Sequence, residues 1–303
     1  MWIGLEINLI SFIPIIINLE NNKKRREAAI KYFLIQAIAS AIVIFRSLYY
    51  FLLGGYSFSY TPNAIMTLAL AIKVGIAPFH FWFPEVLEGL NWINALLLLT
   101  WQKISPLLII SLFFHSRILL PLALISALLG AVSGINQTSI RKILAFSSIS
   151  HLGWMRRMMF LNSSLWIDYF IIYIFTSLIL CLSFWIINLN YFSQLTLVKN
   201  LNEKFIIFIN LLSLGGLPPL LGFFPKWIAM ITIRNNFPIL VILISSSLIT
   251  LYFYTRLCFR TFTLFIQSIV WSQKNNSQKN FYLLRIITFL TTFGILPLSL
   301  INF

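Results

Sequence analysis

Acidic residues are scarce in this chain of 303 residues, which carries 7 Asp and Glu against 22 Lys and Arg. Cysteine is scarcer still: Cys181 and Cys258 stand in separate apolar runs, so neither a disulfide framework nor a cysteine metal site is expected. The chain also lacks a glycine-rich phosphate loop and a nucleophile–base pair. These absences argue against a hydrolytic or redox site built by this chain alone.

Apolar residues make up 59% of the sequence, and the mean hydropathy is +0.90. A soluble domain is nearer half apolar and a quarter charged, whereas only 10% of these residues are charged. The composition therefore predicts an all-α, polytopic transmembrane helix bundle that forms one domain over residues 1–303. At about 20 residues per span, this length holds about ten helices.

The formal net charge is +15. In a soluble protein such a charge would suggest nucleic acid, but here the basic residues are scattered over loops and helices. Membrane orientation and contact with anionic phospholipid explain them better, and no nucleic-acid partner is expected. The first residues, Met1 to Glu6, carry no basic region and no cleavage site, so they predict neither a signal peptide nor a transit peptide.

The apolar runs also predict where loops interrupt the helices. Residues 18–27 contain four consecutive basic residues and are expected to form a loop between the first two spans. Residues 188–204 are expected to be a loop or an interfacial helix, with Lys204 in contact with solvent. The last two spans are expected at 238–265 and 282–301.

Two apolar runs contain helix-breaking residues beside a lysine. In residues 211–227, two glycines and then two prolines precede Lys226, and in residues 101–106 Lys103 stands three residues before Pro106. Proline removes a backbone donor, and broken backbone at membrane depth is tolerated only where protein or a water-filled cavity covers it. Two broken helices are therefore predicted, as in an inverted-repeat transporter. The alternative is a pair of ordinary kinked helices whose lysines reach the surface.

Charges inside the apolar runs are the candidate functional residues, because intramembrane charges usually face an ion path. Burial disfavours the charged form of a lysine, so Lys103 is able to gain and lose a proton, and Glu6 is its acidic counterpart. Lys73 lies at helix depth between them in this hypothesis. Lys142 either marks a helix start at the surface or is carried inward by a longer preceding helix. Among the histidines, His151 is the one expected near an ion path.

Five stretches, spread in order over nearly the whole chain, resemble the chain 2 family of mitochondrial NADH–ubiquinone oxidoreductase, complex I. The stretches are Gly-Leu-Glu-Ile-Asn (4–8), Ala-Pro-Phe-His-Phe-Trp-Phe-Pro-Glu (77–85), Thr-Trp-Gln-Lys-Ile-Ser-Pro (100–106), the run from Asn-Gln-Thr-Ser to Ser-His-Leu-Gly-Trp (136–154) and Leu-Gly-Gly-Leu-Pro-Pro-Leu-Leu-Gly-Phe-Phe-Pro-Lys-Trp (214–227).

This resemblance implies an antiporter-like, proton-translocating subunit of the membrane arm, in the mitochondrial inner membrane. It implies no cofactor in this chain, because NADH, FMN, iron–sulfur clusters and ubiquinone belong to other subunits of the complex. It implies other membrane-arm subunits as partners, including another antiporter-like chain, together with inner-membrane phospholipid. By the family's pattern, the proton path maps onto Glu6, Lys103, Lys142 and Lys226, with Lys73 as an added candidate.

The chain departs from the family's pattern in two places. The family usually has one more apolar helix before the segment with Glu6, so either a helix has been lost or the start codon is placed too late. Arg46, Arg156 and Arg157 stand where apolar or small hydroxyl residues are expected, and the chain has only 6 Met. Some mitochondrial codes read AGA and AGG as Ser and AUA as Met. Translation with a different table would explain both features and would lower the net charge to +12 (15 − 3).

Three functions compete at this point. The leading hypothesis is redox-driven proton translocation within complex I. A structural membrane subunit, which only connects its neighbours, would instead seal its lysines in dry, neutralised pairs. An independent cation/proton antiporter subunit of the same ancestry is expected to be longer than about ten spans.

Overall fold

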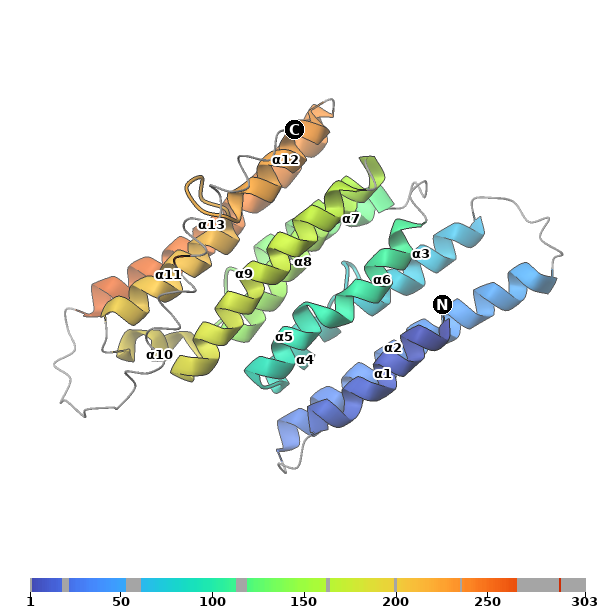
Figure 1. Ribbon diagram of the computed structural model, residues 1–303, viewed down its shortest axis with the longest axis horizontal. Helices are drawn as coiled ribbons and strands as arrows, with labels where there is room; N and C mark the ends of the chain where they lie inside the picture. Colours follow the sequence, from blue (N-terminus) through green and yellow to red (C-terminus); the bar gives the residue numbers. More distant parts are fainter. Residues whose placement is uncertain are drawn as a thin grey trace.

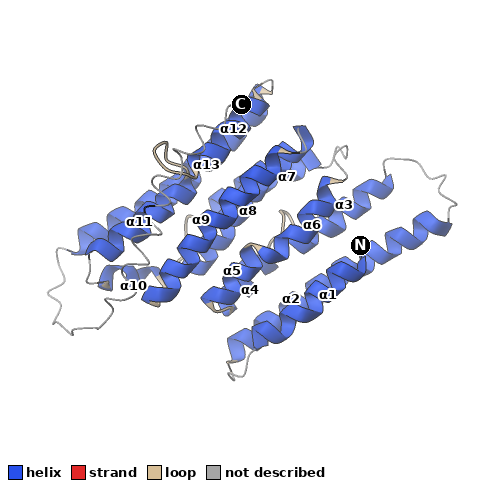
Figure 2. Cartoon of the chain, viewed as in Figure 1, coloured by secondary structure: helices blue, strands red, loops and turns tan. Residues whose placement is uncertain are grey.

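The computed structural model describes residues 2–17, 22–52, 61–112, 119–161, 164–198, 201–234, 236–265 and 289. Every regular secondary-structure element in these residues is a helix (Figure 2). The one β-bridge among them is isolated and joins Ser139 to Tyr191. The predicted all-α class is therefore confirmed for the part of the chain that is described.

The helices lie side by side as tilted rods, with α1 and α2 at one edge and α11, α12 and α13 at the opposite edge (Figure 1). The described helices are α1 (Trp2–Ile17), α2 (Lys23–Leu52), α3 (Thr61–Val74), α4 (Trp82–Gly89), α5 (Trp92–Leu99), α6 (Trp101–Ser111), α7 (Leu119–Ser133), α8 (Ile140–Leu161), α9 (Leu165–Ile187), α10 (Phe192–Leu197), α11 (Leu201–Gly215), α12 (Phe223–Ile233) and α13 (Phe237–Phe265).

Membrane spans are evident from length and composition. Four stretches are long and apolar enough to cross a membrane, namely Lys23–Tyr49, Trp92–Ser111, Leu165–Ile187 and Phe237–Phe259. The pairs α3–α4, α5–α6 and α11–α12 are consecutive short helices separated by brief interruptions. With each pair taken as one crossing and α10 set aside, the described residues hold nine crossings, close to the predicted ten. The span predicted at 282–301 lies outside the described residues.

The sequence-based prediction of the helices is wrong in two places. Helix α2 begins at Lys23, so the basic residues predicted for a loop occupy its first turns. Lys and Arg are good helix formers, and their long side chains reach the polar surface from a helix end. Helix α4 was not predicted; Pro84 stands in its first turn, where the missing N–H has no helical partner to lose.

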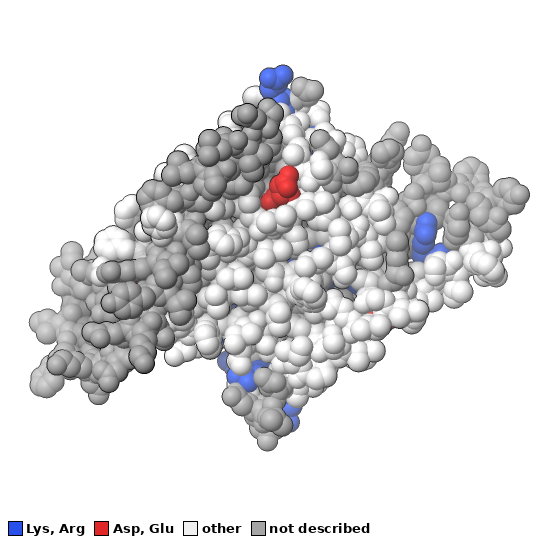
Figure 3. Space-filling view, in the orientation of Figure 1, with Lys and Arg blue, Asp and Glu red and all other residues white. Residues whose placement is uncertain are grey.

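The core of the bundle is apolar, and so is much of its outer surface. Large side chains such as Phe12, Phe184 and Tyr254 are fully buried, whereas Ile7 and Ile10 on α1 are 62% and 64% exposed. Few charged groups are visible on the broad face of the molecule (Figure 3). A surface of this kind fits a bilayer or neighbouring membrane subunits.

Candidate functional site

The first helix break places Lys103 in the interior. Helix α5 ends at Leu99 and α6 begins at Trp101, while the hydroxyl of Thr100 between them donates to the Leu96 carbonyl at 2.8 Å. A break near Lys103 is therefore confirmed, but it precedes the lysine, and Pro106 is accommodated inside α6. Lys103 stands in the first turn of this second half-helix and is 2% exposed.

The ammonium of Lys103 has no hydrogen-bond partner among the described residues. It lies 4.6 Å from the ring centroid of Phe83 and 5.6 Å from that of Tyr173. Aromatic faces stabilise a cation but accept no proton. The geometry thus leaves the N–H donors of Lys103 available to another group.

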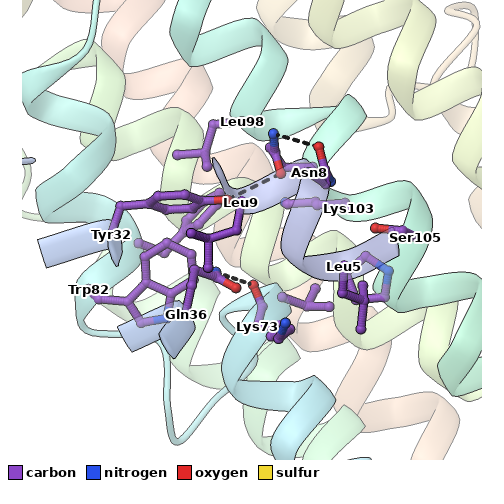
Figure 4. A pocket seen from close by; sticks show the side chains of 14 residues that line it. Leu5, Asn8, Leu9, Tyr32, Gln36, Lys73, Trp82, Leu98, Lys103 and Ser105 are labelled. Carbon is purple, nitrogen blue, oxygen red and sulfur yellow. Dashed lines mark hydrogen bonds between the residues drawn. The ribbon is translucent and has the colours of Figure 1, made fainter. Parts of the chain in front are cut away.

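A small cavity lies beside Lys103, with Lys73 also in its wall (Figure 4). Its volume is about 20 Å³, which is room for a single water molecule. The lining is polar on one side, where Asn8, Gln102 and Ser105 contribute side chains. A water molecule in this position would find the two or more polar partners that a buried water needs.

Side-chain hydrogen bonds connect four helices, α1, α2, α3 and α6, around this cavity. The Tyr32 hydroxyl donates to Oε1 of Gln102 at 3.1 Å, and Nε2 of Gln102 donates to Oδ1 of Asn8 at 3.1 Å. Nε2 of Gln36 donates to the carbonyl of Lys73 at 3.0 Å (Figure 4). The sequence interpretation missed these four residues. The available signal was the uncommon amide and phenol groups within apolar helices.

Glu6 on α1 pairs with Lys73 on α3. Nζ of Lys73 lies 3.8 Å from Oε1 of Glu6, which is an ion-pair distance longer than a hydrogen bond. The side chain of Lys73 is 3% exposed and that of Glu6 is 21% exposed. The structure therefore brings Glu6, Lys73 and Lys103 to one region, with Lys73 as the direct partner of the acid.

The second helix break surrounds Lys226. Helix α11 ends at Gly215 and α12 begins at Phe223, which confirms the break predicted from the paired glycines and prolines. Nζ of Lys226 donates to the carbonyl of Gly215 at 2.7 Å, so the lysine satisfies a backbone oxygen that the break leaves free. Gly216 has a φ of +84°, and a Cβ at this position would lie 3.1 Å from Nζ of Lys226. Both the turn and the approach of the lysine therefore favour glycine there.

His151 on α8 lies between the two breaks. Its Nδ1 is 2.8 Å from the Tyr169 hydroxyl, and its ring centroid lies 5.3 Å from that of Tyr173. The Tyr173 ring also lies 5.6 Å from Nζ of Lys103, so His151 and Lys103 share this aromatic neighbour. His151 therefore lies near Lys103, and its place on an ion path stays a prediction.

Lys142 does not join this group. It stands in the first turn of α8, its side chain is 30% exposed, and its Nζ lies 2.7 Å from Oε2 of Glu88. The preceding helix α7 ends at Ser133, so nothing carries Lys142 inward. Its position is that of a helix start at the end of the bundle.

Lys204 was predicted to be solvated, and this prediction is wrong. It lies in the first turn of α11 with 0% exposure, and its Nζ donates to the Thr196 carbonyl at 3.1 Å. The short helix α10, which ends at Leu197, folds back near the start of α11 and supplies that carbonyl. Burial here comes from a tertiary contact that local composition does not reveal.

Arg156 and Arg157 on α8 are both buried, at 0% and 1% exposure. None of their guanidinium nitrogens has a hydrogen-bond partner among the described residues. The guanidinium carbon of Arg157 lies 5.3 Å from the ring centroid of Phe160. Arg46, in contrast, is partly exposed on α2 and has an interaction partner.

Metal ligands do not cluster in the part of the chain that is described. No group of three or more His, Cys, Asp or Glu side chains there is able to hold a metal ion. Cys181 and Cys258 are both buried and free.

Known proteins match this chain over most of its length. The family described as "NADH:quinone oxidoreductase/Mrp antiporter, TM" matches residues 1–251. NADH-ubiquinone oxidoreductase chain 2 of Anopheles gambiae is 46% identical over 308 positions, covering 99% of this chain and 90% of the relative. The chain belongs to the NADH-ubiquinone oxidoreductase chain 2 family. Chain 2 of Mus musculus is 42% identical and is covered over 82% of its length.

Solved structures show the same fold as this member of the chain 2 family. A chain of respiratory complex I from Thermus thermophilus with bound aureothin superposes with a TM-score of 0.82 at 23% identity, covering 98% of this chain and 73% of that one. A chain of the archaeal membrane-bound sulfane sulfur reductase gives 0.80 at 13% identity, with coverage of 98% and 68%. A chain of the Mrp complex from Dietzia gives 0.71 at 17% identity, with coverage of 84% and 55%. The antiporter-like fold is thus confirmed.

Proposed function

We propose that this chain is the antiporter-like, proton-translocating subunit of the membrane arm of respiratory complex I, NADH:ubiquinone oxidoreductase. Protons move through a buried line of Lys73, Lys103, His151 and Lys226, and Glu6 serves as the acidic partner of Lys73. Lys142 is assigned to the end of the bundle, outside this line.

The observation that carries the proposal is the setting of Lys103. Its ammonium is buried, has no carboxylate partner among the described residues, and borders a cavity with room for one water molecule. A subunit that only connects its neighbours is expected to neutralise each buried lysine with an acid, because an unpaired buried charge is costly. A lysine beside water is instead able to exchange a proton.

The proposal assigns no redox centre and no cofactor to this chain. NADH oxidation, FMN, the iron–sulfur clusters and ubiquinone chemistry belong to other subunits of the complex. The partners are other membrane-arm subunits, including another antiporter-like chain, and inner-membrane phospholipid. The site of action is the mitochondrial inner membrane.

An independent cation/proton antiporter remains the runner-up, because the matching family also covers the transmembrane subunits of Mrp antiporters. The two functions differ in what drives transport. Proton movement that starts with NADH oxidation, and stops with an inhibitor of that oxidation, supports the complex I subunit. Movement driven by a cation gradient alone supports the antiporter.

A map of the assembled complex that resolves ordered water tests the pump against the structural subunit. We expect a water molecule within hydrogen-bond distance of Nζ of Lys103 in the cavity shared with Lys73. We also expect water or direct contacts to continue towards His151 and Lys226. A dry cavity, closed by an acidic side chain of another subunit against Lys103, would favour the structural role.

Glu6→Gln is expected to lower the number of protons moved per NADH by up to about fivefold, the upper range for a partly exposed ion pair. The neutral amide no longer responds to the charge of Lys73, which lies 3.8 Å away. Proton uptake by vesicles containing the reconstituted complex measures the effect. Glu27→Gln is the control, because Glu27 is exposed on the first part of α2. Equal results for the two variants would remove Glu6 from the path.

A further inference from the structure

A second cavity lies at the end of the bundle, apart from the cavity beside Lys103. Its volume is about 240 Å³, and its lining is mainly polar. Lys24, Arg25 and Arg141 contribute to the lining, together with Ser139, Asn91 and Asn190. Basic side chains gather at the same lower end of the molecule, where α2 begins and α4 meets α5 (Figure 3). None of these residues is used by the proposed proton path.

Three helices start at this cavity. Asn22, Asn91 and Ser139 line it, and they directly precede α2, α5 and α8. A helix N-terminus carries free N–H groups and a partial positive charge, so it favours an anion. Asn91 makes no side-chain capping hydrogen bond to α5. The backbone therefore adds positive potential to that of the basic side chains.

Two residues of the cavity wall also carry buried donors that have no partner among the described residues. Ser139 is 4% exposed, and its hydroxyl has no hydrogen-bond partner among the described residues. Arg141 donates from Nη1 to the Glu88 carbonyl at 2.8 Å and from Nη2 to Oδ1 of Asn190. Its guanidinium carbon lies 5.1 Å from the ring centroid of Trp92. The Nε–H of the same group is buried and unpartnered. The arginine is thus held in place with one donor left over.

The charge balance of the cavity is positive. Lys24, Arg25 and Arg141 face one acid, Glu88, and that carboxylate is already paired with Lys142 at 2.7 Å. The amide of Asn91 also forms part of the polar wall. Nη2 of Arg25 donates to Oδ1 of Asn91 at 2.5 Å, and this bond holds the guanidinium beside the cavity. A basic pocket with fixed donors and spare hydrogen-bonding groups fits a tetrahedral oxyanion better than a neutral ligand.

We propose that this cavity binds a phosphate group through Ser139, Arg141, Arg25 and Lys24. The same chemistry serves the headgroup of an anionic phospholipid at the membrane surface and free inorganic phosphate. The cavity is large enough for either group, and its position at the ends of apolar helices makes both accessible. The inference rests on this cavity alone and does not depend on the proposed proton path.

Density maps of the assembled complex distinguish the two sources. The complex is prepared in nanodiscs of phosphatidylglycerol without phosphate, and in phosphatidylcholine nanodiscs with inorganic phosphate. Phosphate density against Ser139 and Arg141 that continues into acyl chains supports the lipid. Isolated tetrahedral density in the second sample alone supports free phosphate. An empty cavity in both samples, or a carboxylate of a neighbouring subunit filling it, overturns the proposal.

A matched pair of variants tests the residues. Lys24→Gln and Lys23→Gln remove the same charge from adjacent, exposed positions at the start of α2, but Lys24 lines the cavity and Lys23 does not. We expect Lys24→Gln to weaken retention of phosphatidylglycerol, or binding of phosphate, by about fivefold, and Lys23→Gln to have little effect. Ser139→Ala, which removes a small group with no partner to lose, is expected to weaken binding by about tenfold. Native mass spectrometry of the complex measures the retention of phosphatidylglycerol and the binding of phosphate in each variant. Equal retention in all three variants contradicts the site.

Discussion

Replacing Lys103 by arginine will stop proton translocation although the positive charge remains. A guanidinium stays protonated under all working conditions, so it is able to hold the position of the ammonium but not to release a proton. Lys103 has no acidic partner among the described residues, so there is no ion pair that an arginine would preserve. We expect proton movement per NADH to fall by at least about tenfold, since a positioned acid or base usually contributes more than that. Reconstituted vesicles with a pH-sensitive dye measure the fall.

Lys204 provides the matched control for Lys103. Both lysines are buried, but Lys204 stands at the start of α11, outside the proposed path. Its ammonium donates to the carbonyl of Thr196 on α10. Lys103→Met and Lys204→Met remove the same charge at similar side-chain volume, and only enzyme that has assembled is compared. We expect Lys204→Met to lower the yield of assembled complex and to leave pumping per NADH unchanged. Normal pumping by Lys103→Arg, or equal losses for the two methionine variants, would favour a structural role.

Peptides from the native protein will show serine, not arginine, at positions 156 and 157. An arginine at the centre of a membrane helix costs roughly 2.5–3.5 kcal/mol on insertion scales, and here two adjacent ones are buried without a hydrogen-bond partner among the described residues. A pair of like charges also repels. Both costs therefore fall on the same turn of α8.

Serine suits the same positions on α8. This helix already buries Ser147, Ser148 and Ser150, and each hydroxyl donates to the carbonyl three residues earlier, at 2.9, 2.6 and 2.7 Å. A serine at 156 or 157 would find the same type of acceptor, as mid-helix serines commonly do. Translation of AGA or AGG codons with another table accounts for the substitution, and it also predicts methionine at some of the positions printed as isoleucine.

Mass spectrometry of the peptide spanning residues 155–158 decides the question. Arg25 and Arg141 are the internal controls, because their guanidinium groups donate to named acceptors and should prove to be arginine. Arg46 belongs to the same test, although its partial exposure and its interaction partner make arginine less costly there. A mass matching arginine at 156 and 157 would falsify the prediction by itself. Guanidinium density there, with an acidic partner within hydrogen-bond reach, would do the same.

Local chemistry was enough to predict several elements of the fold. Helix α13 (Phe237–Phe265) matches the span predicted at 238–265, and the glycines and prolines of residues 211–227 predict the break between α11 and α12. The break before Lys103 was predicted at residues 101–106, but it lies at Thr100. Proline does not mark it, because α6 accommodates Pro106 and the tertiary setting decides where the chain turns.

The candidate site depended more on contacts between distant segments. The pairing of Glu6 with Lys73 joins α1 to α3, and the link from Tyr32 through Gln102 to Asn8 joins three helices. No local pattern encodes these contacts. The opposite placements of Lys142 and Lys204 make the same point, since each stands in the first turn of a helix, and only the packing of α10 buries one of them.

The interruption between α11 and α12 also acts as a mechanical joint. Within a continuous helix, a shift of one half relative to the other must break backbone hydrogen bonds. Residues 216–222 separate the two halves, and the final carbonyl of α11, that of Gly215, accepts a hydrogen bond from Nζ of Lys226 instead of from the backbone. A displacement of α12 therefore stretches a contact of Lys226 before it disturbs any helix. Conversely, loss of the Lys226 proton weakens this hydrogen bond between the two halves, because a neutral amine is a poorer donor than an ammonium. Charge and shape are coupled there through one hydrogen bond.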